Sequence, residues 1–154
     1  MEYYSLQTLV LIELIHHNLN FPKLSASGGT PLGQAVELAV KSLNKRKELY
    51  NQSGIQYYQP MLVLMTDGFA TDDTSGSIKL VKELCNNRKL TVVNIAIGNS
   101  ADLDTLKKFH PDNEVTTINK LEMKDFFRWL SESVKVVSNN NGQRITKSYN
   151  NWNE

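Results

Sequence analysis

The chain has 154 residues, which is the size of a single domain built around one hydrophobic core. Its 17 lysines and arginines almost balance its 16 aspartates and glutamates, so the formal net charge is +1. This balance argues against a surface that binds nucleic acid or membranes by general electrostatic attraction. The one cysteine, Cys85, excludes an internal disulfide and fits a reducing, cytoplasmic compartment.

The first 23 residues form a segment whose structure the sequence leaves open. Apolar residues from Leu6 to Ile15 fit one face of a helix and a buried strand about equally well, and we favour the helix. The apolar run within it, residues 9–12, is much shorter than the ~20 residues that a membrane helix needs. No basic residue precedes that run, as one does in a signal peptide. We therefore expect a soluble protein with no membrane partner.

Residues 24–138 alternate between the apolar spacing of helices and that of buried strands. The predicted elements are a helix over 32–43, a strand over 61–66, a helix over 78–85, a strand over 90–97, a helix over 100–109, a strand over 115–118 and a helix over 126–137. We predict Thr30 as the N-cap of the first helix, with Pro31 in its first turn, and Ser100 as the cap of the third.

This order of strands and helices predicts the fold class. A strand, a helix and a second strand make a βαβ unit with a right-handed crossover. Its continuation along the chain predicts a three-layer, Rossmann-like α/β domain with a mostly parallel sheet. Residues 139–154 are mainly polar, and we expect them to form a flexible tail.

One candidate site residue follows the strand predicted over 61–66. In open α/β sheets, ligands bind beyond the carboxyl ends of the strands. Thr66, Asp67 and Gly68 stand at that position, so a carboxylate is placed where the strand leaves the sheet. Asp67 is therefore a candidate ligand, and the alternative is an aspartate that only caps the turn.

A second candidate lies in the sequence SASGGTPLG at 25–33, just before the first helix. Its glycines allow the backbone to approach a ligand, while the Thr30 hydroxyl and the amides of the helix offer polar contacts. Such a loop suits an anion or helps to hold a cation. The alternative is a tight loop in which Thr30 only caps the helix.

Taken together, the two loops resemble a known family. SASGGTPLG, an amphipathic helix, LVLMTDG and the later FFRWL resemble a von Willebrand factor A domain, most of all the bacterial cytoplasmic type associated with tellurium resistance. Members of this family bind a divalent cation in a metal-ion-dependent adhesion site, formed by an Asp-x-Ser-x-Ser loop, a threonine and an aspartate. The resemblance implies Thr30 and Asp67 as metal ligands and Mg²⁺ as the cation, which prefers such oxygen ligands.

The N-terminal part of the sequence departs from the family pattern. No Asp-x-Ser-x-Ser motif precedes Thr30, and 23 residues are too few for the elements that usually precede this loop. We therefore expect an N-terminally incomplete domain, with a partial site that binds Mg²⁺ weakly or not at all. A literal match at Asp73-Thr74-Ser75-Gly76-Ser77 follows no strand, and we predict that it begins the helix that carries Ile78.

These features favour a non-enzymatic module that binds a protein partner offering a carboxylate, in a tellurite or stress response or in phosphorylation-linked signalling. One alternative is a remnant that binds no metal. Another is a metal-dependent hydrolase or phosphotransferase that uses Asp67, although Phe69 stands where haloacid-dehalogenase-type enzymes have a second aspartate. A missing N-terminal strand leaves one edge of the strand over 61–66 exposed, so we expect self-association along that edge.

Overall fold

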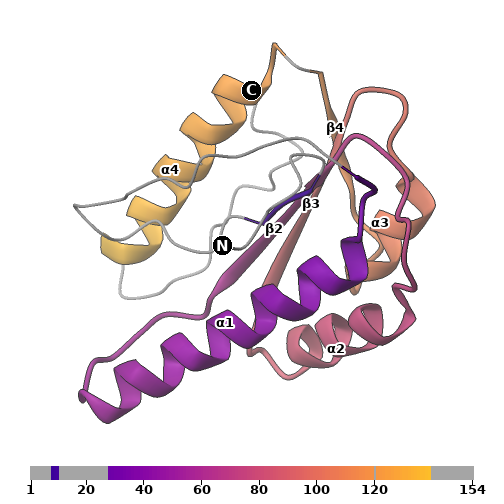
Figure 1. Ribbon diagram of the computed structural model, residues 1–154. Helices are drawn as coiled ribbons and strands as arrows, with labels where there is room; N and C mark the ends of the chain where they lie inside the picture. The colour runs from indigo at the N-terminus through magenta and orange to yellow at the C-terminus, as the bar shows by residue number, and fades with distance from the viewer. Residues whose placement is uncertain (1–7, 11–27, 120, 140–154) are drawn as a thin grey trace.

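The computed structural model describes residues 8–10, 28–119 and 121–139 (Figure 1). Its elements are β1 (Thr8–Val10), α1 (Leu32–Gln52), β2 (Met61–Thr66), α2 (Ser75–Asn86), β3 (Thr91–Ile97), α3 (Leu103–Phe109), β4 (Thr116–Ile118) and α4 (Met123–Asn139). The described strands form one sheet in the order β1-β2-β3-β4, in which β2, β3 and β4 are parallel. The predicted α/β class with a mostly parallel sheet is confirmed.

The central strands are buried on both faces, as their unbroken apolar sequences predict. On one face, Leu62 and Leu64 of β2 belong to a core that α1, α2 and α3 cover. On the other face, Val63 and Met65 cluster with Phe126 of α4. Figure 1 shows α4 on the opposite side of the sheet from α1 and α2. The predicted three layers are therefore present, and the alternation along β2 assigns each side chain to its layer.

A buried polar residue, Asn94, joins β3 to its neighbours. Its side-chain amide donates hydrogen bonds to the carbonyl of Leu106 at 2.8 Å and to that of Glu114 at 3.3 Å. Asn94 therefore connects the strand to α3 and to the segment that enters β4. The Asn94 side chain is fully buried, so these bonds offset part of the cost of removing an amide from water.

The N-terminal segment contains a strand where we favoured a helix. Residues Thr8–Val10 form β1, which pairs antiparallel with β2, and Leu9 lies opposite Met65. The helix prediction is therefore wrong over these three residues. The physical reason is that a short apolar run fits both periods, and the unpaired edge of β2 decides between them by offering backbone hydrogen bonds. The expected open edge is likewise wrong at Leu64–Thr66, where β1 covers it.

The helices are present as predicted, but their ends differ. Helix α1 continues to Gln52, well beyond the apolar stripe that ends at residue 43. The third helix begins at Leu103, and its N-cap is Asp102, so the prediction of Ser100 as the cap is wrong. An aspartate whose carboxylate accepts the Thr105 amide satisfies a helix start better than a serine two residues earlier.

Other sequence predictions lie outside the described residues. These include the rest of the segment over 1–23, residues 24–27 and the tail from residue 140 onward. Within the part of the chain that the structure describes, no helix is long and apolar enough to cross a membrane.

Candidate functional site

Three loops meet at the carboxyl edge of the sheet: the α1-entry loop (28–31), the β2 loop (67–74) and the β3 loop (98–102). The amide of Thr71 donates to the carbonyl of Thr30 at 2.9 Å, which joins the first two loops. The amide of Asp102 donates to the carbonyl of Gly68 at 3.3 Å, which joins the second and third. Backbone hydrogen bonds therefore hold the three loops together, independently of any ligand.

The structure brings Thr30 and Asp67 to neighbouring loops, as the sequence predicts. Thr30 is buried, with 4% of its surface exposed, and a Cβ atom placed on Gly68 would lie 3.7 Å from the Thr30 hydroxyl oxygen. Asp67 precedes Gly68 directly and is exposed. The Thr66 hydroxyl accepts the amide of Gly68 at 3.3 Å, which shapes the turn that carries Asp67. A buried hydroxyl and an exposed carboxylate thus flank the same turn.

The close approach of the loops depends on a glycine in the α1-entry loop. A Cβ atom placed on Gly29 would lie 2.7 Å from the hydroxyl oxygen of Thr71, which is too close for a normal contact. Any larger residue at position 29 would therefore have to displace the Thr71 side chain or the loop that carries it. In the sequence SASGGTPLG, Gly29 therefore serves the packing between the two loops, in addition to any approach to a ligand.

The first turn of α1 is capped by a residue that the sequence reasoning missed. The prediction of Thr30 as the N-cap is wrong. The N-cap is Pro31, which makes no side-chain capping bond. Instead, the carboxylate of Asp72 accepts the amides of Gly33 at 3.0 Å and Gln34 at 2.8 Å. No local signal points to Asp72, because the capping carboxylate comes from a loop far along the chain. A negative charge at this helix end also interacts favourably with the helix dipole.

The literal Asp-x-Ser-x-Ser match begins a helix, as predicted. Asp73 accepts hydrogen bonds from both the amide and the hydroxyl of Ser75, each at 2.9 Å. Hydrogen bonding from Ser75, first its amide and then its hydroxyl, lowers the pKa of the Asp73 carboxyl. The hydroxyl of Ser77 donates to the carbonyl of Thr74 at 2.9 Å. All three residues of this match are therefore engaged in the start of α2.

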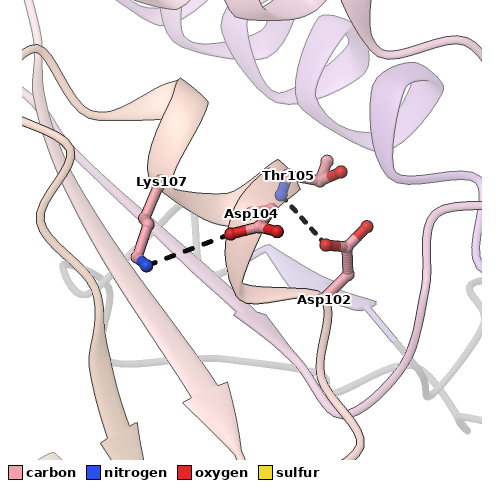
Figure 2. A network of polar contacts seen from close by, with 4 residues as sticks. All are labelled: Asp102, Asp104, Thr105 and Lys107. Carbon is pink, nitrogen blue, oxygen red and sulfur yellow. Dashed lines mark hydrogen bonds and ion pairs between the residues drawn. The ribbon is translucent and has the colours of Figure 1, made fainter.

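The β3 loop ends in another engaged carboxylate (Figure 2). Asp102 accepts the amide of Thr105 at 3.0 Å and thereby caps α3, while Lys107 lies 4.0 Å from Asp104 on the same helix. The side-chain hydrogen bond with Thr105, assisted by backbone hydrogen bonds and by the charge of Lys108, lowers the pKa of Asp102. Asp102 thus holds the β3 loop against Gly68 and starts a helix at the same time.

These contacts decide which carboxylates of the three loops remain for a cation. Asp72, Asp73 and Asp102 each accept backbone amides, whereas Asp67 is exposed at the turn next to Thr30. Carboxylate and hydroxyl oxygens are the donor type that Mg²⁺ prefers. Among the described residues, no three histidine, cysteine, aspartate or glutamate side chains lie together so as to hold a metal ion. The donor type fits Mg²⁺, and the number of protein donors is small.

Comparison with known proteins places this arrangement in a family. The sequence profile of the von Willebrand factor type A domain matches residues 10–129, well over half of the chain. The matched region contains the three loops and every element from α1 to β4. No curated protein and no solved structure matches the chain. The chain belongs to the von Willebrand factor type A domain family.

Proposed function

We propose that the chain is a non-enzymatic protein-binding module that recognises its partner at the carboxyl edge of the sheet, with a divalent cation held by Thr30 and Asp67. Domains of this family commonly mediate protein interactions, in some members through a metal ion. The proposal assigns the cation to Mg²⁺ because the available donors are oxygens. It places the partner's own carboxylate among the ligands, since the chain offers few.

The observation that carries the proposal is the position of Thr30 beside the turn of Asp67. Thr30 is buried against Gly68, and Asp67, which precedes Gly68, is exposed. Thr30 and Asp67 are brought to neighbouring loops although they are 37 positions apart in the chain (67 − 30). Asp72, Asp73 and Asp102 each accept an amide at a helix start, so Asp67 is the aspartate of these described loops without such a role. The Asp67 carboxylate is therefore accessible to an external ligand.

The small donor set also limits the strength of the site. Mg²⁺ gives up its hydration water reluctantly, and two protein ligands replace few of those waters. We therefore expect weak binding of Mg²⁺ by the chain alone and stronger binding when a partner's carboxylate takes part. The cellular setting that we propose, a cytoplasmic response to tellurite or other stress, or phosphorylation-linked signalling, rests on the resemblance of the two loop motifs.

Nuclear magnetic resonance with Mn²⁺ in place of Mg²⁺ tests the site. Mn²⁺ broadens signals of nearby amides, so we expect selective broadening at 28–30 and 67–69 in the full chain. The substitution Asp67→Asn should abolish this broadening, whereas Asp73→Asn should preserve it because an asparagine still begins the helix. Calorimetric titration with Mg²⁺ should show affinity weaker than micromolar.

Two results contradict the proposal in different ways. If no amide is selectively broadened, the chain binds no metal, which is the remnant alternative. If the broadening centres on 73–77 and disappears in Asp73→Asn, the literal motif is the site and Thr30 and Asp67 are not. Micromolar affinity for Mg²⁺ that Asp67→Ala removes would show that the chain supplies a further ligand.

A further inference from the structure

Helix α1 is longer than the strands that it covers, so its last turns extend past the amino edge of the sheet. Its 21 residues span about 31 Å at the helical rise of 1.5 Å, whereas the 6 residues of β2 span about 20 Å. Figure 1 shows the end of α1 and the chain that follows it beyond the start of β2. This end lies opposite the loops that carry Thr30 and Asp67.

Exposed apolar and aromatic side chains gather beyond that edge. Ile55, Tyr57 and Tyr58 are 51%, 40% and 47% exposed, within four consecutive residues of the segment between α1 and β2. The ring of Tyr57 lies 6.0 Å from that of Tyr50 on α1, so the segment is held against the helix. An open hollow of about 440 Å³ lies beside them, lined by Asn51, Gly54, Ile55, Gln56 and Tyr57. Clustered exposed apolar residues of this kind mark interaction surfaces.

Cationic side chains lie on the same end of α1 and on the chain that enters β3. The ammonium of Lys47 donates to the carbonyl of Lys89 at 2.9 Å, which brings α1 next to the chain that enters β3. Partial burial, and then the nearby charge of Lys89, lower the pKa of Lys47. The guanidinium of Arg46 lies 5.8 Å from the centre of the Tyr50 ring. Residues 41–60 and 86–91 together contain four plus two lysines and arginines but a single acidic residue, Glu48.

We propose that this amino-edge surface, formed by Lys47, Ile55, Tyr57, Tyr58, Arg88 and Lys89, binds an acidic segment of a protein partner whose apolar side chain enters the hollow. Charge complementarity selects an acidic partner, and exposed tyrosines beside an open hollow that Ile55 and Tyr57 help to line are typical of protein contacts. A side chain suits this hollow better than a nucleic-acid base, because the ring of Tyr50 already lies against Tyr57 and Arg46. The proposal does not depend on the cation site at the opposite edge.

The backbone of Arg88 offers a way to separate binding from folding. Arg88 follows the C-cap of α2 with a φ of 55°, a conformation that glycine adopts more easily than arginine. The amides of Arg88 and Lys89 donate to the carbonyls of Cys85 and Leu84, as at many helix ends that close with glycine. The substitution Arg88→Gly should therefore raise the urea midpoint of unfolding while it removes an exposed cation of the proposed surface.

The test uses the full chain and a short synthetic peptide of glutamates around one central leucine. In nuclear magnetic resonance titrations, we expect shifts at 46–58 and 88–89 and binding that weakens as salt rises. Arg88→Gly and Lys89→Glu should each weaken binding about two- to fivefold, the effect of one exposed charge pair. Tyr58→Ala should also weaken it. Lys124→Glu, a charge reversal on α4, is the matched control and should leave binding unchanged.

Each other outcome overturns the proposal. If a peptide in which glutamines replace the glutamates binds as tightly as the glutamate peptide, charge does not select the partner. Tighter binding of an oligothymidine strand than of the peptide would assign the surface to nucleic acid. An absence of shifts at 46–58 and 88–89 with every probe would show that the surface is not a binding site. Unchanged binding by both Arg88→Gly and Lys89→Glu would show that the cations of this surface do not contribute.

Discussion

At the scale of single residues, the carboxylates of the carboxyl edge have separate tasks. Asp72 caps α1, Asp73 accepts the Ser75 amide at the start of α2, Asp102 caps α3, and Asp67 remains exposed at the turn next to Thr30. The sequence identified Asp67 because it follows a recognisable strand, and it identified the role of Asp73 from the helix that follows. It did not identify Asp72 as a cap, since sequence spacing carries no information on which distant amides a carboxylate meets.

Replacement of Asp72 should destabilise the fold, because two amides of α1 lose their partner. We expect Asp72→Ala to lower the free energy of unfolding by about 1–2 kcal/mol, as for the loss of an N-cap. Urea unfolding measures this change. Asp67→Ala, in the same loop but exposed, should change stability by less than about 0.5 kcal/mol. An equal loss in both variants would show that the capping bonds of Asp72 contribute nothing specific.

Asp102 should make stability depend on pH in the acidic range. Its pKa is lowered in the folded chain, so it stabilises the fold above the ordinary aspartate pKa of about 3.9, and this stabilisation is lost as the pH falls through the lower folded value. Asp102→Asn should therefore lose less stability than the unchanged chain between about pH 7 and about pH 3. Urea midpoints at the two values provide the measurement.

The control for this experiment is Asp104→Asn on the same helix. Asp104 is exposed and its ion pair with Lys107 is long, at 4.0 Å, so its removal should leave the loss on acidification close to that of the unchanged chain. The interpretation fails if Asp102→Asn loses as much stability on acidification as the unchanged chain does.

At the scale of elements, apolar periodicity predicts the helices and strands of the described core. It fails where a contact with a distant part of the chain decides the structure. The runs at 61–66 and 91–97 are strands because both faces are apolar, and this pattern is local. The run that contains Leu9 is too short for its period to be decisive, and its pairing with Met65 decides it. Likewise, α1 continues past its apolar stripe, where Tyr50 meets Tyr57 and Lys47 meets the Lys89 carbonyl, and periodicity within the helix predicts neither contact.

Two glycines near the starts of α1 and α2 should respond to alanine with opposite signs. A Cβ atom at Gly33 would lie 2.5 Å from the carbonyl oxygen of Asp73, so Gly33→Ala should destabilise by about 1–3 kcal/mol. At Gly76 the nearest atom, the Glu37 carboxylate oxygen, is 3.7 Å away. Gly76→Ala should therefore stabilise by about 0.5 kcal/mol through helix propensity.

Thermal or urea unfolding of both variants checks the sign. If Gly33→Ala stabilises as Gly76→Ala does, the β2 loop adapts to the added methyl group, and the close packing of α1 on that loop is not essential. The sequence motif alone predicts no such difference, because it shows a glycine near each helix start and not the loop that packs on one of them.

At the scale of the whole molecule, β1 is the element that protects the sheet edge. It covers Leu64–Thr66 of β2, which the sequence reasoning expected to be open for association with a second copy. Neighbouring residues of an antiparallel strand direct their amides to opposite sides, so either Thr8 or Leu9 directs its amide toward β2. Proline has no amide hydrogen, and the double substitution Thr8→Pro and Leu9→Pro therefore removes at least one hydrogen bond to β2. We expect the variant to associate as concentration rises, because an unpaired edge invites another strand.

Size-exclusion chromatography with light scattering, at several concentrations, compares the variant with the unchanged chain. A larger concentration dependence of mass in the variant supports the role of β1. If the variant is as monomeric as the unchanged chain and melts as cooperatively, the edge of β2 needs no cover. If the variant and the unchanged chain associate strongly and to the same extent, the surface through which the copies associate lies away from the edge of β2.

The cap that Asp72 gives to α1 also constrains the order in which the chain gains structure. Gly33 and Asp72 are 39 positions apart, and β2 lies between them. During synthesis, the first turn of α1 therefore lacks its carboxylate until the whole of β2 and the loop after it have emerged. The start of this helix and the docking of β2 should form in one cooperative step, so hydrogen exchange at Gly33 and Gln34 should report the stability of the sheet and not that of an isolated helix.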